Sequence, residues 1–201
     1  IHVAISRCRS HQSNMNSVQR GEQAMYHCHL QFYLTGCPCG TFERIKEINP
    51  LERFTHNFTG SDEVKDSLAA RADIIVANLM EKDCQKAVQA LLAAKRPEAE
   101  LIVLAAKEQI PLFQEFLGEV CDIWVLPMSD DEAEFRFRKW QQTYKMKKDY
   151  WQTSQFFEAT INHVPNLIWY KDKNGIHEKV NDSFCSTVNK TKEQVEGRGH
   201  A

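Results

Sequence analysis

The feature that most constrains this fold is a repeated alternation of short apolar runs with amphipathic segments across residues 30–127. The run DIIVANL at residues 73–79 is rich in β-branched side chains, which is typical of a strand that is covered on both faces. Residues 83–96, which follow it, repeat apolar side chains at helical spacing. Short connections between strands and helices in alternation predict a parallel sheet with helices on both sides.

The alternation predicts five strands and four connecting helices. We expect strands at residues 29–36, 53–58, 73–79, 99–106 and 121–127, and helices at residues 41–48, 61–72, 83–96 and 110–120. Ser61 is expected to cap the second helix and Pro111 to lie in the first turn of the fourth. The predicted fold class is therefore α/β, with a doubly wound five-stranded parallel sheet whose functional groups gather at the carboxyl ends of the strands.

Composition and charge exclude several classes of partner. The chain has 201 residues, 42% of them hydrophobic, and a formal net charge of -2, which gives no argument for nucleic acid or an anionic membrane. No uncharged apolar window approaches about 18 residues, so no membrane span is expected. Seven cysteines, an odd number, favour a reducing, cytoplasmic setting over a disulfide framework.

One cluster of possible metal ligands occurs in the sequence HCHLQFYLTGCPC, and its members are His27, Cys28, His29, Cys37 and Cys39. Imidazole and thiolate groups bind zinc, but this spacing matches no common zinc motif. Cysteine also behaves as a small apolar residue in protein cores. We therefore expect no metal and no other cofactor.

The order of elements in residues 26–128, with the sequence CDIWVLPMS at the fifth strand, resembles a response-regulator receiver domain. The resemblance implies a flavodoxin-like fold with its site at the carboxyl edge of the sheet. Such domains hold magnesium with an acidic pair after the first strand and accept a phosphoryl group on an aspartate after the third. They also use a serine or threonine after the fourth strand and a lysine before a proline after the fifth.

None of these groups stands at the matching positions of this sequence. The first strand ends in LTGCPC without a carboxylate, and the other positions hold Asn78, Ala105 and Leu126. A carboxamide is neutral and a poor nucleophile, and magnesium prefers anionic oxygen ligands. We therefore expect a degenerate phosphoacceptor pocket in a phosphorylation-incompetent pseudo-receiver. A doubly wound domain unrelated to receivers is the alternative.

A long helix is predicted across residues 129–163, since no glycine or proline interrupts it and Ser129 with Glu132 forms a capping box. Its aromatic residues follow steps of three, four and seven, which is an a/d-like seam made of Phe137, Trp140, Tyr144 and Trp151. The seam has two interpretations, packing against the neighbouring domain or a parallel dimer helix that relays a signal. Both can hold at different heights along the helix.

Residues 164–201 resemble the beginning of a PAS domain, through the sequence NLIWYKDKNGIHEKVNDSFCSTVN. A hairpin is expected with Asn174 and Gly175 in a two-residue turn, followed by two short helices. The first helix is capped by Asn181 or Asp182, and the second by Thr191. Only the first two strands of such a domain occur here, which implies a truncated domain. Two aromatic residues could line a ligand pocket or simply pack, and these are Trp169 and Phe184.

The sequence therefore divides into four predicted parts, and the first is an N-terminal extension that is disordered or lies ahead of the natural start. The parts are residues 1–25, the receiver-like domain 26–128, the helical linker 129–163 and the PAS-like part 164–201. This order is typical of the input region of a bacterial signalling protein. The expected missing output domain is a diguanylate cyclase of GGDEF type, which makes cyclic-di-GMP.

Under this interpretation the chain has no catalytic activity and forms a homodimer through the long helix, with an unknown small ligand or protein as its signal. An input region of a histidine kinase is one alternative. A small α/β enzyme is another, with a nucleophile among Cys37, Cys39 and Cys84 and a base from His27 or His29.

Overall fold

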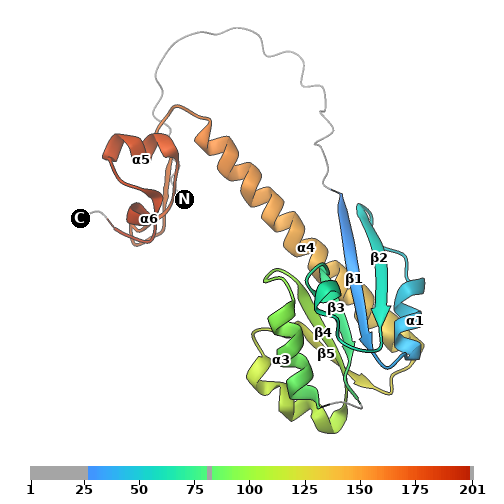
Figure 1. Ribbon diagram of the computed structural model, residues 1–201. Helices are drawn as coiled ribbons and strands as arrows, with labels where there is room; N and C mark the ends of the chain where they lie inside the picture. The colour runs from blue at the N-terminus through green and yellow to red at the C-terminus, as the bar shows by residue number, and fades with distance from the viewer. Residues whose placement is uncertain (1–26, 81–82, 200–201) are drawn as a thin grey trace. The chain divides into compact units, whose positions relative to one another are not determined.

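The computed structural model describes residues 27–80 and 83–199 of the chain (Figure 1). Within these residues the chain forms two compact units, 27–143 and 144–199, and each is described separately. No helix of the described residues combines the length and the apolar character that crossing a membrane requires.

The first unit is built on a five-stranded sheet with the strand order β2-β1-β3-β4-β5. All four neighbouring pairs are parallel, which confirms the predicted doubly wound architecture. The strands are β1 (Cys28–Gly36), β2 (Phe54–Ser61), β3 (Ile74–Asn78), β4 (Glu100–Ala106) and β5 (Asp122–Leu126).

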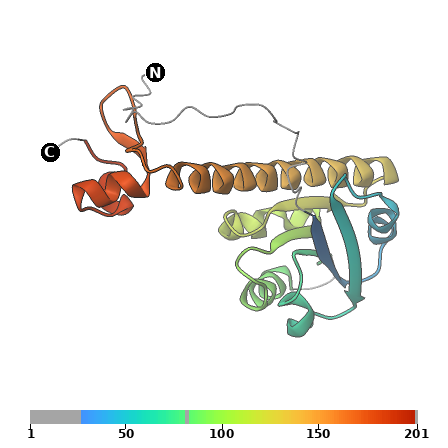
Figure 2. The ribbon, with the colours of Figure 1, turned by 90° about the horizontal axis from the view of Figure 1, so that it is seen from above.

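Helical segments cover both faces of this sheet. They are α1 (Gly40–Glu47), α2 (Asp66–Ala69), α3 (Cys84–Ala94), the 3-10 helix η1 (Lys107–Phe116) and the long helix α4 (Asp130–Asn162). One face packs β-strand residues such as Ile75 and Val103 against Val88 of α3 and Phe113 of η1. The other face lies under α1 and the beginning of α4, and Figure 2 shows α3 and α4 on opposite sides of the sheet.

Two predicted helices differ in the structure. The helix expected at residues 61–72 is reduced to Asp66–Ala69, and Ser61 ends β2 instead of capping a helix. The buried hydroxyl of Tyr33 explains the difference, because it lies 2.6 Å from Ser61 Oγ, donates to Glu63 O at 3.0 Å and accepts from Lys65 N at 2.8 Å. These bonds hold the chain after β2 in a non-helical conformation.

The helix expected at residues 110–120 begins earlier and is a 3-10 helix, Lys107–Phe116. Pro111 lies inside it and not in the first turn of an α-helix. Because proline lacks an N–H and its ring clashes with the carbonyl four residues earlier, Pro111 is incompatible with a regular α-helix that begins at Lys107.

An aromatic cluster fixes the beginning of α4 on the sheet. The ring of Phe32 on β1 lies 5.7 Å from Phe137, 5.5 Å from Trp140 and 4.8 Å from His56 of β2, measured between ring centroids. Phe137 and Trp140 stack on each other at 5.5 Å. Phe32 and Phe137 are fully buried, so this cluster is the core of the α4 face.

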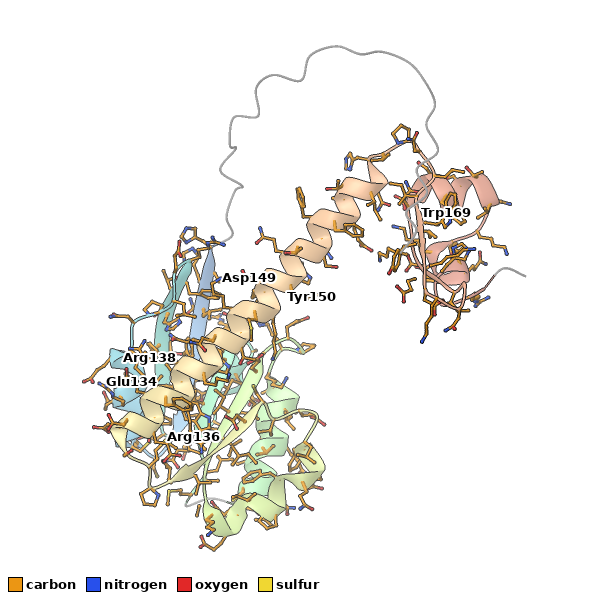
Figure 3. All side chains as sticks on the ribbon, turned by 180° about the vertical axis from the view of Figure 1, so that it is seen from behind. Glu134, Arg136, Arg138, Asp149, Tyr150 and Trp169 are labelled. Atoms are coloured by element: carbon orange, nitrogen blue, oxygen red, sulfur yellow. The ribbon has the colours of Figure 1, made fainter. Side chains whose placement is uncertain are left out.

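Charged groups add a rim to this packing. Glu134 of α4 accepts from Arg44 of α1 and from Arg138 one turn further along α4, the latter at 2.7 Å (Figure 3). The hydrogen bond from Arg138, followed by that from Arg44, lowers the pKa of the Glu134 carboxyl below its usual value. The carboxylate therefore stays ionised and links α1 to α4.

The second unit contains the remainder of α4 and a small antiparallel ribbon with two short helices. The elements are β6 (Trp169–Lys171), β7 (His177–Val180), α5 (Asp182–Val188) and α6 (Lys192–Val195). Asn181, fully buried, caps α5 by accepting from Phe184 N at 3.1 Å, as predicted. Its Oδ1 also accepts from Ile168 N at 3.0 Å, and its Nδ2 donates to Ile161 O at 3.0 Å.

The turn between β6 and β7 differs from the two-residue hairpin expected there. Only Gly175 has a positive φ, 79°, whereas Asn174 does not. The carboxylate of Asp172 instead organises the turn, because its Oδ1 accepts from Asn174 N at 2.9 Å and from Ile176 N at 2.8 Å. An aspartate that bonds the backbone two residues on is a common alternative to a positive φ.

The half-buried histidine of the aromatic cluster, His56, predicts a pH dependence of stability. Burial lowers the pKa of His56 to about 4, and its Nδ1 is buried without a hydrogen-bond partner among the described residues. The unfolded chain therefore binds the proton more readily than the folded one, and stability falls as the pH drops from about 6.5 towards 4. We expect the free energy of unfolding, measured with urea, to fall less between pH 7 and pH 5 in His56→Phe than in the unsubstituted chain.

The comparison uses the difference between the two proteins, which cancels the titration of carboxylates that they share. Parallel stability profiles across this pH range would contradict the assignment of His56.

Candidate functional site

The candidate site is the carboxyl edge of the parallel sheet, where Gly36 of β1 pairs in register with Asn78 of β3. Gly36 has φ of 97°, and a Cβ added to it would lie 2.1 Å from the carbonyl oxygen of Asn78. Only glycine fits such a conformation and such a close approach. The two strand ends are therefore held against each other with no side chain between them.

The side chain of Asn78 is engaged within the fold. It is 6% exposed, its Nδ2 donates to Cys37 O at 2.8 Å, and its Oδ1 accepts from Met80 N at 3.3 Å. A carboxylate at this position could not donate to the carbonyl of Cys37. The amide thus joins the loop after β1 to the loop after β3.

Gln109 forms the second half of this amide network. Its Oε1 accepts from Ala106 N at 2.8 Å, where β4 ends. Its Nε2 lies 3.3 Å from both Leu79 O and Met80 O, and 2.8 Å from Cys84 Sγ. Sequence reasoning missed Gln109, although its place directly after a predicted strand at the functional edge was an available signal.

Apolar side chains occupy the remaining predicted positions of the edge. Ala105 is fully buried and belongs to the core cluster that includes Leu79 and Cys84. Leu126 is 9% exposed and precedes Pro127 through a cis peptide bond. The structure thus places Asn78, Ala105 and Leu126 at or next to the ends of three neighbouring strands, β3, β4 and β5.

Cys84 is a buried thiol at this edge. Its Sγ donates to Leu79 O at 3.6 Å, and burial raises the pKa of the thiol above its ordinary value. Burial therefore favours the neutral thiol of Cys84 over the reactive thiolate. Among the described residues, no group of three histidine, cysteine or acidic side chains is placed to hold a metal ion.

The residues of the sequence motif divide between the two ends of β1, with His27, Cys28 and His29 at its start and Cys37 and Cys39 after its end. His29 stands near the start of the strand and its Nδ1 lies 2.7 Å from Thr55 Oγ1, whereas Cys37 follows the last residue. At about 3.3 Å per residue, His29 and Cys37 are separated by roughly 25 Å along the strand. The five residues therefore do not form one metal site, and Cys37 and Cys39 are not placed beside His27 or His29.

The predicted seam of α4 divides into two parts. Phe137, Trp140 and Tyr144 are at most 7% exposed, while Trp151 is 63% exposed. Trp140 packs in the aromatic cluster and its Nε1 donates to Glu100 Oε2 at 2.8 Å. The packing interpretation thus holds for Phe137 and Trp140, and the dimer interpretation stays a prediction for the part of the helix beyond them.

A different apolar stripe is exposed on the later part of α4. Met146, Tyr150 and Phe157 are 61%, 78% and 52% exposed, and their spacing of four and seven places them on one side of the helix. Figure 3 labels Tyr150 on this part of α4. No element of residues 144–199 buries these side chains.

The two aromatic residues predicted for a PAS-type pocket lie close together, with ring centroids 5.7 Å apart. Trp169 stands on β6 and is labelled in Figure 3, and Phe184 stands on α5. Phe184 lines a cavity of about 210 Å³ together with His177 and Val188, whereas Trp169 does not line it. The pair thus contributes one residue to a cavity and one to packing.

Comparisons with known proteins find only weak structural similarity. No protein-family model matches the chain, and no curated protein matches it. A CpaE2 pilus assembly protein from Sinorhizobium meliloti 1021 is similar over 54% of this chain and 99% of its own, with 14% identity and a TM-score of 0.40. A pilus assembly protein CpaE from Caulobacter crescentus CB15 is similar over 54% and 90%, with 10% identity and a TM-score of 0.41. No family assignment follows from similarity at this level.

The amide network predicts that Asn78→Asp is destabilising. The substitution removes the donor to Cys37 O and places a carboxylate among carbonyl oxygens, which costs about 2 kcal/mol or more of the free energy of unfolding. Urea unfolding at pH 7.5 measures the change. Asn49→Asp is the matched control, because the side chain of Asn49 is exposed and forms no hydrogen bond with a described residue, and it should change stability by no more than about 0.5 kcal/mol. Equal effects of the two substitutions would contradict the role of Asn78.

Proposed function

We propose that residues 26–128 form a receiver-like regulatory domain that cannot be phosphorylated. The observation that carries the proposal is the amide network of Asn78 and Gln109 at the carboxyl edge. Both side chains are neutral and use their polar atoms within the fold. A phosphoacceptor site needs a nucleophilic carboxylate and anionic oxygen ligands for magnesium, and Ala105 and Leu126 supply neither a hydroxyl nor an ammonium group.

In this proposal α4 is the output of the domain. The helix is continuous for 33 residues, and its beginning is fixed on the sheet by Phe137 and Trp140. A signal that changes the packing of these rings would rotate or shift the rest of the helix. Such a relay requires a helix with two packings that a ligand or partner stabilises differently.

The proposal extends to the rest of the protein. Residues 164–201 are the N-terminal part of a PAS domain, supported by the order of a β-ribbon followed by two short helices, the first capped by Asn181. The output is a diguanylate cyclase of GGDEF type, with a histidine kinase as the alternative, and this step rests on the order of the parts alone. The chain itself has no catalytic activity.

The relay works through a homodimer in which the exposed part of α4 pairs with its copy. The stripe of Met146, Tyr150 and Phe157 supports this pairing, because large apolar side chains at four-and-seven spacing suit a coiled-coil seam. Trp151 lies about 100° around the helix from Tyr150 and marks a different face.

The phosphorylation proposal is tested with acetyl phosphate and magnesium. We expect no base-labile increase in the mass of the intact chain, because Asn78 stands where the nucleophile would be and the described residues of the edge offer no group of metal ligands. Asn78→Asp restores only the carboxylate and is expected to remain unmodified. A phosphorylated species of the unsubstituted chain, mapped to the carboxyl edge, would overturn the proposal.

Sedimentation equilibrium tests the dimer proposal. We expect a dimer whose dissociation constant rises at least about tenfold in Tyr150→Glu and in Phe157→Glu, since each buries a charge in an apolar seam.

Trp151→Glu is the matched control on the other face and should leave the dimer intact. Loss of the dimer in Trp151→Glu alone would place the seam on the face that continues from Trp140. A monomer at all concentrations would exclude the relay through paired helices.

A further inference from the structure

The C-terminal unit contains the cavity that Phe184 lines, and the functions above name no ligand for it. It lies between β7, α5 and α6, encloses about 210 Å³ and is open to solvent on one side. Its apolar wall consists of Phe184, Val188 and Val195. Phe184 also packs on the ring of His177, with 5.5 Å between the centroids. The wall suits an apolar body of limited size.

The first cation at this cavity is Lys190, and the end of α5 fixes its position. Asn189 ends the helix in the left-handed conformation with φ of 52°, and Lys190 N donates to Cys185 O at 3.1 Å. This bond belongs to a common C-terminal capping motif. The backbone of Lys190 is therefore held at the cavity independently of any ligand.

The second cation is Arg198, which the start of β7 fixes through two backbone hydrogen bonds. His177 N donates to Arg198 O at 2.9 Å, and Gly197 N donates to His177 O at 2.8 Å. Gly197 has φ of 78°, which allows the chain to turn back onto β7. The two cations thus reach one cavity from different segments.

The charge of these two side chains is not balanced within the fold. Neither Lys190 nor Arg198 forms an ion pair with any described residue, and no carboxylate lines the cavity. The neighbouring Glu196 is used elsewhere, because its Oε1 accepts from Val180 N at 3.1 Å and lies 3.8 Å from Lys179 Nζ. Two like charges at one mouth favour an anion.

We propose that this cavity binds a small organic anion, with its carboxylate between Lys190 and Arg198 and its apolar body against Phe184, Val188 and Val195. A cavity of roughly 150 Å³ holds benzene, so about 210 Å³ takes a body of eight to ten non-hydrogen atoms with its head group at the mouth. Arginine is well suited to hold a carboxylate through two parallel bonds. The proposal depends only on described residues and stands whether or not the receiver-like function holds.

The test is a titration of the whole chain with benzoate at constant ionic strength, followed by amide chemical shifts in heteronuclear NMR. We expect saturable shifts at residues of the cavity, among them Val188, Lys190 and Gly199. Benzamide has the same shape without the charge and should bind at least about tenfold more weakly, because it loses charge-assisted hydrogen bonds. Inorganic phosphate has the charge without the apolar body and should produce no saturable shifts there.

Lys190→Gln and Arg198→Gln should each weaken benzoate binding about tenfold, and both side chains are exposed, so the fold is expected to persist. Lys173→Gln removes the same charge from the exposed turn before β7 and is the matched control. Val188→Phe fills the cavity and should abolish binding. The proposal is overturned if benzoate gives no saturable shifts, if benzamide or phosphate binds equally well, or if Lys173→Gln weakens binding as much as the cavity variants.

Discussion

The packing of three aromatic rings, Phe32 of β1 with Phe137 and Trp140 of α4, is the interaction on which the rest of the first unit depends. A parallel sheet must be covered on both faces, and α4 supplies much of the cover on one of them. The rings exclude water from the middle of that face. They also decide which side of α4 is turned inward, and so which side chains of its later turns are left to other partners.

The carboxyl edge of the sheet is held by polar side chains and not by aromatic packing. Functional groups of doubly wound sheets gather there because strand ends leave backbone groups and loop side chains around a crevice. In this chain two neutral amides, Asn78 and Gln109, occupy that crevice and join the loops after β1, β3 and β4. Their bonds stabilise the edge, and among the described residues no group of three histidine, cysteine or acidic side chains is placed to hold a metal ion. At this edge the two amides serve to connect the loops of the fold.

The strands were predictable because β-branched runs and short connections depend on local sequence alone, and the run of residues 73–79 is an example. The site was predictable only in part. Asn78, Ala105 and Leu126 follow from strand order, whereas the role of Gln109 depends on contacts about 25 to 30 residues away in the chain. The short α2 likewise reflects a distant hydroxyl, that of Tyr33. The burial of Trp140 follows from its packing on Phe32 of the sheet, which helical spacing does not encode.

Asn181 couples three segments of the second unit to one another. One buried amide bonds to the last turns of α4 through Ile161, to the segment before β6 through Ile168, and to the start of α5 through Phe184. The hydrogen bonds of this one side chain therefore hold three segments together that could otherwise move independently. A rotation of the end of α4 would therefore move the β6–β7 ribbon with it, because the loop between α4 and β6 is held to both by Asn181.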